Sequence, residues 1–167
     1  MSVEGAIEVS IKDGPLGAAR LPPEPAADAA ETGARQGEKH KEKRPKRKRG
    51  LEGVTSVDCA PIHQVGAVVV FEGIVRGEED GQRIAALNYT AYDPMATMEL
   101  TKLARDVLEK HGLKRVVVEH SRGRVCVGEV SFRLTIWSAH RKESLAAMDE
   151  FIDRMKEDVP IWKSAER

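Results

Sequence analysis

The sequence predicts an α+β domain in which two helices pack on a mixed sheet that is rich in antiparallel pairs. Three observations predict this class. Several short segments alternate apolar and polar residues, which is typical of strands with one buried face. Two longer segments repeat apolar residues at helical spacing. The expected strands precede each helix in pairs, after one further strand at the N-terminus, so strands and helices do not alternate one by one.

The chain divides into three parts along its length. A strand is expected over residues 6–11, where every second residue is Ile or Val. Residues 17–53 are rich in Pro, Ala and basic residues, and they have almost no large apolar side chains to offset the entropy lost on ordering. We therefore expect an N-terminal strand over 1–16 that joins the core, a disordered insertion over 17–53, and the main domain over 54–167.

The charge of the chain is unevenly distributed. The chain has 27 basic and 27 acidic residues, so its net charge is zero. Residues 38–49 contain eight basic and two acidic residues, which leaves an acidic remainder with a net charge of −6. An acidic body argues against a general nucleic-acid coat protein. The basic run itself is open to three interpretations: a solvated linker, a tether for nucleic acid or an acidic protein, and a nuclear localisation signal.

Several protein classes do not fit the sequence. No stretch approaches the roughly 18–20 apolar residues of a membrane span, and residues 1–14 lack the apolar region of a secretory signal. Cys59 and Cys126 form neither a metal motif nor a disulfide framework. The histidines lie at no metal-binding spacing, so we expect no metal site and no cofactor. These features favour a cytoplasmic protein.

The main domain opens with strand signals. Residues 65–71 are a nearly continuous apolar run, which predicts a strand buried on both faces. Residues 77–81 form a polar loop bounded by glycines. Alternation of apolar and polar residues resumes over 84–92, which predicts a second strand.

The first helix is bounded by recognisable signals. Asp93 is expected to cap its N-terminus, with Pro94 at the first helical position, and Gly112 is expected to end it. A short strand is expected next, over residues 116–118. The apolar stripe of the first helix comprises Leu100, Leu103, Ala104, Val107 and Leu108.

A hairpin-like region punctuated by Gly123 and Gly128 leads to the last strand and the last helix. Residues 130–136 alternate cleanly, so this strand is expected to have one core face. The last helix is expected to begin near Arg141 and to end at Pro160. Its apolar stripe comprises Leu145, Met148, Ile152 and Met155.

Positively charged side chains stand at the ends of the expected elements. Arg76 follows the first apolar strand, and His140 and Arg141 lie where the last strand passes into the last helix. Lys156 lies in the last turn of that helix, and Lys163 follows the helix. Such junctions suit an anionic ligand. Arginine suits phosphate, whereas a desolvated lysine can also act as acid, base or nucleophile. The residues alone therefore predict an anion-binding domain of undefined chemistry.

Four segments stand out in the main domain: 66–76 (GAVVVFEGIVR), 87–96 (LNYTAYDPMA), 138–141 (SAHR) and 155–163 (MKEDVPIWK). In their order and spacing, they resemble the large, catalytic subunit of molybdopterin synthase. The resemblance covers about residues 65–163, and the strand at 6–11 is similar to the opening strand of that family. It implies a fold of the α/β-hammerhead kind, consistent with the α+β prediction.

The resemblance implies a sulfurtransferase of molybdenum-cofactor biosynthesis. Members of the family convert cyclic pyranopterin monophosphate into molybdopterin. The sulfur arrives as a C-terminal glycine thiocarboxylate on a small ubiquitin-like partner subunit, whose tail enters a pocket on the large subunit. The implied assembly is a heterotetramer, with a central homodimer of large subunits and one small subunit at each end. The partner supplies the sulfur, so neither cysteine of this chain is needed as a sulfur carrier.

Matched residue by residue, five positions acquire expected roles. Lys156 resembles the catalytic lysine beside the thiocarboxylate, and Lys163 resembles a second essential lysine. Arg76, His140 and Arg141 resemble binders of the pterin and its phosphate, and the last two are candidates to serve the neighbouring subunit's site. Lys156 either stabilises or protonates a tetrahedral species, or acts as a neutral base. The alternatives to this enzyme are a non-catalytic module of the same fold that binds an anion or nucleic acid, and a sulfur-transfer scaffold with another acceptor.

Overall fold

The computed structural model describes residues 6–17 and 64–167, and all of these residues belong to one compact unit. The insertion expected over 17–53, with its basic run at 38–49, lies outside the described residues except for Gly17. Cys59 also lies outside them. Neither of the two described helices is long and apolar enough to cross a membrane.

The described residues form two helices and eight strands. The helices are α1 (Met95–His111) and α2 (Arg141–Asp158). The strands are β1 (Ile7–Asp13), β2 (Ala67–Ile74), β3 (Glu78–Glu79), β4 (Gln82–Arg83), β5 (Ala86–Ala91), β6 (Arg115–Cys126), β7 (Val130–Ser138) and β8 (Ile161–Glu166).

Six strands form one sheet in the order β2-β7-β6-β5-β8, with β1 added parallel to β6. The other pairs in this sheet are antiparallel, and β3 and β4 form a separate small hairpin. The predicted α+β fold with a mixed, antiparallel-rich sheet is therefore confirmed.

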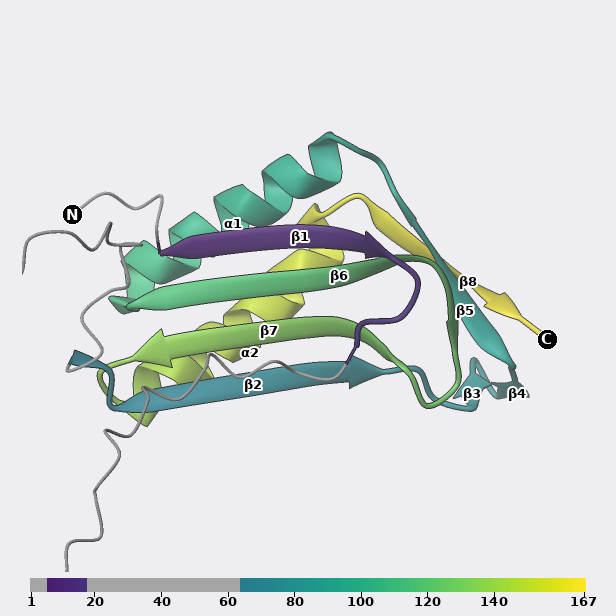
Figure 1. Ribbon diagram of the computed structural model, residues 1–167, viewed down its shortest axis with the longest axis horizontal. Helices are drawn as coiled ribbons and strands as arrows, with labels where there is room; N and C mark the ends of the chain where they lie inside the picture. The colour runs from purple at the N-terminus through teal and green to yellow at the C-terminus, as the bar shows by residue number, and fades with distance from the viewer. Residues whose placement is uncertain (1–5, 18–63) are drawn as a thin grey trace, which may run out of the picture. The chain divides into compact units, whose positions relative to one another are not determined.

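Both helices cover the same face of the sheet (Figure 1). Helix α1 packs on β1 and β6, and α2 packs on β2 and β7. Apolar side chains that repeat every second residue on the strands meet those that repeat at helical spacing, and burying them removes apolar surface from water. The core between the layers includes Leu100, Val107, Val116, Val118, Leu134, Ile136 and Phe151.

The prediction that the first apolar strand of the main domain is buried on both faces is wrong. That strand, β2, lies at an edge of the sheet, and its Val68 and Val70 are 46% and 39% exposed. The strand buried on both faces is β7, which was expected to have a single core face. Its second face buries Arg133, whose guanidinium pairs with the carboxylates of Glu72 (2.7 Å) and Glu119 (2.9 Å). Paired charges can be buried where an unpaired one could not.

The N-terminal cap predicted for α1 is also wrong. Pro94 occupies the N-cap position, and no side chain caps the helix. The carboxylate of Asp93 instead accepts hydrogen bonds from Arg122 (2.9 Å) and from the hydroxyl of Thr97 (3.1 Å). The predicted end of the helix is confirmed, because Gly112 adopts a left-handed conformation with φ 61°.

The buried stripe of α2 is rotated from the predicted one. Met148 is buried as expected, but Leu145 is 54% exposed, and Ser144 and Phe151 lie in the core. Ser144 tolerates burial because its hydroxyl is 2.6 Å from that of Ser138 on β7. Small, hydrogen-bonded side chains therefore let the start of α2 lie close against β7.

Strand β6 is much longer than the short strand predicted, and it changes partners along its length. Its last pair with β7 is His120 with Phe132, after which the two strands diverge. Strand β6 then continues through Gly123, with φ 82°, and pairs with β5 from Tyr89 onward. Strand β8, which the sequence patterns did not predict, pairs with β5 and brings Lys163 opposite Tyr89.

Candidate active site

A cavity of about 670 Å³ opens where β6 and β7 diverge. Its lining comes from the end of β2 and the segment after it, from β5, β6 and β7, from the last turns of α2 and from β8. One part of the lining, here called the inner wall, consists of Tyr89, His120, Ser131 and Phe132. The charged side chains that line the cavity are Arg76, Glu79, Lys156 and Lys163.

Three of the five predicted site residues, Arg76, Lys156 and Lys163, therefore line a single cavity. Arg76 follows Val75, whose backbone is held in place by two hydrogen bonds. The N–H of Val75 donates to the carbonyl of Glu129 (3.0 Å), and the Val75 carbonyl accepts a hydrogen bond from the N–H of Gly128 (2.8 Å). The arginine thus leaves the sheet beside the connection between β6 and β7.

The two lysines reach the cavity from α2 and β8. Lys156 lies one turn beyond Ile152, near the C-terminus of α2, where the helix dipole favours a positive charge. Among the described residues, neither Lys156 nor Arg76 has an ion-pair partner, whereas Lys163 pairs with Glu79 at 2.5 Å. The hydrogen bond from Lys163 lowers the pKa of Glu79 below its ordinary value, against the opposing effect of burial, and the charges of Lys163 and Arg76 lower it further.

The inner wall is ordered by aromatic contacts and hydrogen bonds. The ring of Tyr89 meets that of His120 edge-on at 5.3 Å, and His120 lies 5.6 Å from the ring of Phe132. The Tyr89 hydroxyl donates to the hydroxyl of Ser131 (3.0 Å), which donates in turn to the carbonyl of Gly73 (3.1 Å). The hydroxyls of Tyr89 and Ser131 thus each have a partner, which holds these two side chains in one arrangement.

Sequence patterns alone had assigned no chemistry to His120, which is only 5% exposed. Burial lowers the pKa of His120 below its ordinary value and outweighs the opposing hydrogen bond between its Nδ1 and the Ser121 carbonyl, 2.8 Å away. The imidazole is therefore neutral at neutral pH. The signal that could have found it is its place in the alternation of β6, on the same face as Val116 and Val118.

The other two predicted site residues lie at the opposite end of α2. His140 is the N-cap of that helix, and Arg141 is its first residue. At about 1.5 Å per residue, the helix places them more than about 20 Å from Lys156. Both are exposed, and the hydroxyl of Ser138 donates to the His140 carbonyl at 2.6 Å, which holds the junction. Within one chain, these two residues do not join the cavity.

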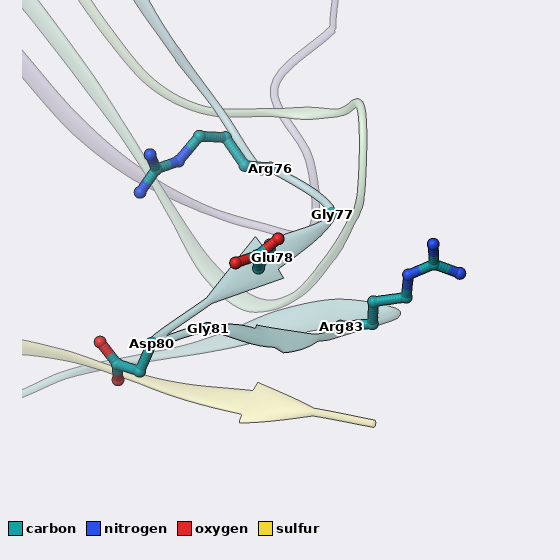
Figure 2. A pocket seen from close by; sticks show the side chains of 6 residues that line it. All are labelled: Arg76, Gly77, Glu78, Asp80, Gly81 and Arg83. Atoms are coloured by element: carbon teal, nitrogen blue, oxygen red, sulfur yellow. The ribbon is translucent and has the colours of Figure 1, made fainter.

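A second hollow, of about 620 Å³, shares Arg76 with the cavity and is lined by the β3–β4 hairpin (Figure 2). The hairpin turns at Asp80 and Gly81, whose φ angles of 51° and 75° suit a two-residue turn. The side chains of Arg76 and Arg83 extend in opposite directions in Figure 2, so they do not converge on a shared anion. The contribution of the hairpin to the cavity is to present Glu79 to Lys163.

No group of three His, Cys, Asp or Glu side chains that could hold a metal ion occurs in residues 6–17 and 64–167.

Comparison with known proteins identifies a family. The profile of the family described as MoaE protein matches residues 51–158. A human protein named molybdopterin synthase catalytic subunit is 37% identical over 116 residues, which are 70% of this chain and 61% of the relative. A protein of the same name from Thermoplasma volcanium is 42% identical over 98 residues, which are 59% of this chain and 72% of the relative. The chain thus spans about three-fifths of the length of the human relative.

Solved structures share the fold. Molybdopterin synthase from Staphylococcus aureus is 36% identical, with a TM-score of 0.58 over 62% of this chain and 75% of that chain. A complex of subunits 1 and 2 of molybdopterin-converting factor from Helicobacter pylori is 31% identical, with a TM-score of 0.54 over 64% of this chain and 69% of that chain. The family predicted from the four sequence segments is confirmed: the chain belongs to the MoaE protein family.

Proposed function

We propose that this chain is the catalytic subunit of a molybdopterin synthase. It takes sulfur from the C-terminal thiocarboxylate of a small ubiquitin-like partner and transfers it to cyclic pyranopterin monophosphate, forming the dithiolene of molybdopterin. The observation that carries the proposal is that Arg76, Lys156 and Lys163, from three separate segments, line one cavity. The names of the relatives support the same activity.

The charge of the cavity matches the charge of both reactants. The pterin carries a cyclic phosphate, and the tail of the partner carries a thiocarboxylate, so both are anions. The charged lining consists of three cations and one carboxylate, Glu79, which is already paired with Lys163. Because the inner wall replaces water on one side, the cations attract these anions more strongly there than on an open surface.

Each cation has a distinct role in this proposal. The ammonium group of Lys156 lies beside the acyl carbon of the tail and stabilises the negative charge of the tetrahedral species from which sulfur leaves. Lys163 is restrained by its pair with Glu79 and holds an anionic group of the substrate. The forked donors of Arg76 suit the phosphate oxygens.

His140 and Arg141 fit this function only in a dimer. They are too far from Lys156 to reach the cavity of their own chain, yet they are exposed and held in place at the start of α2. We place them in the cavity of the neighbouring subunit, within a homodimer that carries one small subunit at each end. The complex of two subunits solved from Helicobacter pylori supports a small partner.

The test is a reconstitution from purified components. The chain is mixed with cyclic pyranopterin monophosphate and a small subunit that carries a C-terminal thiocarboxylate, and molybdopterin is measured as product. Omitting the thiocarboxylate, with the unmodified carboxylate form as the control, should abolish the product. If the complete mixture forms no molybdopterin while the chain shows salt-sensitive DNA binding that is lost on deleting residues 39–49, the binding-module alternative replaces this proposal.

A further inference from the structure

One ionisable group of the cavity, His120, has no role in the proposal above. It is the last residue of β6 to pair with β7, opposite Phe132, so it lies where the two strands diverge and the cavity opens. The rings of Tyr89 and Phe132, at 5.3 Å and 5.6 Å, contact the imidazole and limit its rotation. The orientation of the imidazole is therefore set by the fold.

The hydrogen bond at Nδ1 defines which ring nitrogen carries the proton. A carbonyl oxygen can only accept, so Nδ1 donates its hydrogen to the Ser121 carbonyl at 2.8 Å, and Nε2 keeps a free lone pair in the neutral ring. Nε2 makes no hydrogen bond with any described residue, and the His120 side chain lines the cavity.

Among the described residues that line the cavity, His120 is the best candidate for a general base. Burial lowers the pKa of His120, which keeps the imidazole neutral. Glu79 is paired with Lys163, and the Tyr89 hydroxyl donates to Ser131. A neutral imidazole oriented by a carbonyl, in a cavity that two lysines also line, is suited to moving a proton. The charged and titratable groups that share the cavity with it are Arg76, Glu79, Tyr89, Lys156 and Lys163.

We propose that His120 is the general base of this site and that its Nε2 accepts a proton from the water that separates the partner's tail from the transferred sulfur. The inference rests on the proposed function and adds to it a catalytic residue on the inner wall.

The step balances without an oxidant or a reductant. The thiocarboxylate sulfur first forms a C–S bond to a carbon of the pterin as a C–O bond at that carbon breaks and the oxygen leaves with its electron pair, which gives a thioester between that sulfur and the acyl carbon of the tail. Water then attacks the acyl carbon, and as the new C–O bond forms, one water proton passes to Nε2 of His120. The C–S bond breaks and the sulfur keeps the electron pair as a thiolate on the pterin. The tail leaves as a carboxylic acid that ionises, and His120 returns its proton to solvent.

Two variants with uncharged amide side chains test this role. H120N can still donate to the Ser121 carbonyl, and H120Q can still place a polar group near the position of Nε2, but neither side chain titrates. Each full-length variant is combined with thiocarboxylated small subunit and pterin, and the single-turnover rate is measured across pH. We expect the rate to fall by about 10²–10⁴-fold in both variants, while the Kd for the pterin, measured by calorimetry, stays within about threefold of wild type.

The pH profile separates a base from a merely structural residue. The wild-type rate should hold through neutral pH and fall only at acid pH, where His120 becomes protonated, and both variants should lack this acid limb. H111Q is the matched control, because His111 pairs with Glu150 between the helices and should leave the rate and the limb unchanged.

The outcomes are distinguishable. If either folded variant turns over within about threefold of wild type and keeps the acid limb, the assignment of His120 as the base is overturned and the proposed function stands. If the wild-type chain itself forms no product in the same assay, the proposed function and this inference are both overturned.

Discussion

The two ends of α2 carry similar residues in different surroundings. At its C-terminal end, Lys156 lies on a cavity that also receives Arg76 and Lys163. At its N-terminal end, His140 and Arg141 are exposed, and among the described residues neither has an ion-pair partner. A cation at the end of an element is thus not enough to form a site. The C-terminal end becomes one because β8 turns back along β5 and because β6 diverges from β7 beside it.

The largest effect should come from removing the cation at the cavity end. We expect K156A to lower the single-turnover rate of dithiolene formation by about 10²–10³-fold, because the charge that develops on the acyl oxygen loses its stabilising group. Binding of the small subunit, measured by calorimetry, should persist. K142A changes an exposed lysine at the other end of the same helix and serves as the control. Turnover close to wild type in K156A would remove Lys156 from the mechanism.

The relation between the two ends can be tested by mixing subunits. K156A and R141A are each expected to be nearly inactive alone. If each cavity takes Lys156 from one subunit and Arg141 from the other, random mixing should restore about a quarter of the wild-type activity, because half of the dimers are mixed and each has one intact cavity. No recovery, with subunit exchange verified by mass spectrometry, would mean that the two ends do not share a cavity across a dimer.

A smaller effect on the kinetics is expected from removing the carboxylate that pairs with Lys163. E79Q removes the carboxylate that pairs with Lys163 at 2.5 Å, so the lysine should become more mobile. We expect KM for the pterin to change by about two- to tenfold, with kcat less affected, since a positioning contact rather than the reacting group is altered. Steady-state kinetics check this, and E78Q on the neighbouring exposed carboxylate is the matched control. An unchanged KM would show that the pair with Glu79 does not position Lys163.

The smallest effect is expected from a substitution in the middle of α2. Glu150 of α2 accepts hydrogen bonds from Lys110 (2.9 Å) and His111 (2.8 Å) of α1, which lower its pKa to about 2. A lowered pKa means that this contact stabilises the fold above pH 4.5, the ordinary value for Glu, and is lost as the pH falls towards 2. E150Q should therefore lower Tm by about 2–4 °C at pH 7.

Calorimetry at several pH values checks that prediction. The difference in Tm between E150Q and wild type should shrink as the pH approaches 2. Turnover should be unchanged, because the substitution touches neither end of α2. A constant difference in Tm at all pH values would assign the effect to packing rather than to the charge of Glu150.

The sequence predicted the class of the fold but not the place of each strand in the sheet. The apolar run of β2 was expected to be buried on both faces but lies at an edge, while the alternating β7, between β2 and β6, is buried on both faces. Hydrophobicity shows that a side chain prefers to leave water, but not which element covers it. The polar face of β7 is buried because Arg133 finds the carboxylates of Glu72 and Glu119 on neighbouring strands, and such pairing is visible only in three dimensions.

Only part of the candidate site could be predicted from the sequence. Arg76, Lys156 and Lys163 could be selected because charges at element ends follow from local patterns. His120 could not, because a single histidine in an apolar alternation is also what a filled core contains, and its significance depends on the divergence of β6 from β7. The hairpin-like region expected around Gly123 concealed that divergence, because Gly123, with φ 82°, lies within the long strand β6.

The divergence of β6 from β7 has a thermodynamic consequence. The surfaces that enclose the cavity come from segments far apart in the chain, from Phe71 to Lys163, so the unfolded chain retains nothing of it. A ligand that fills it binds only the folded form, and at one hundred times its Kd it adds about 2.7 kcal/mol to the free energy of unfolding. The melting temperature of this protein therefore reports what fraction of the chains has a ligand in the cavity.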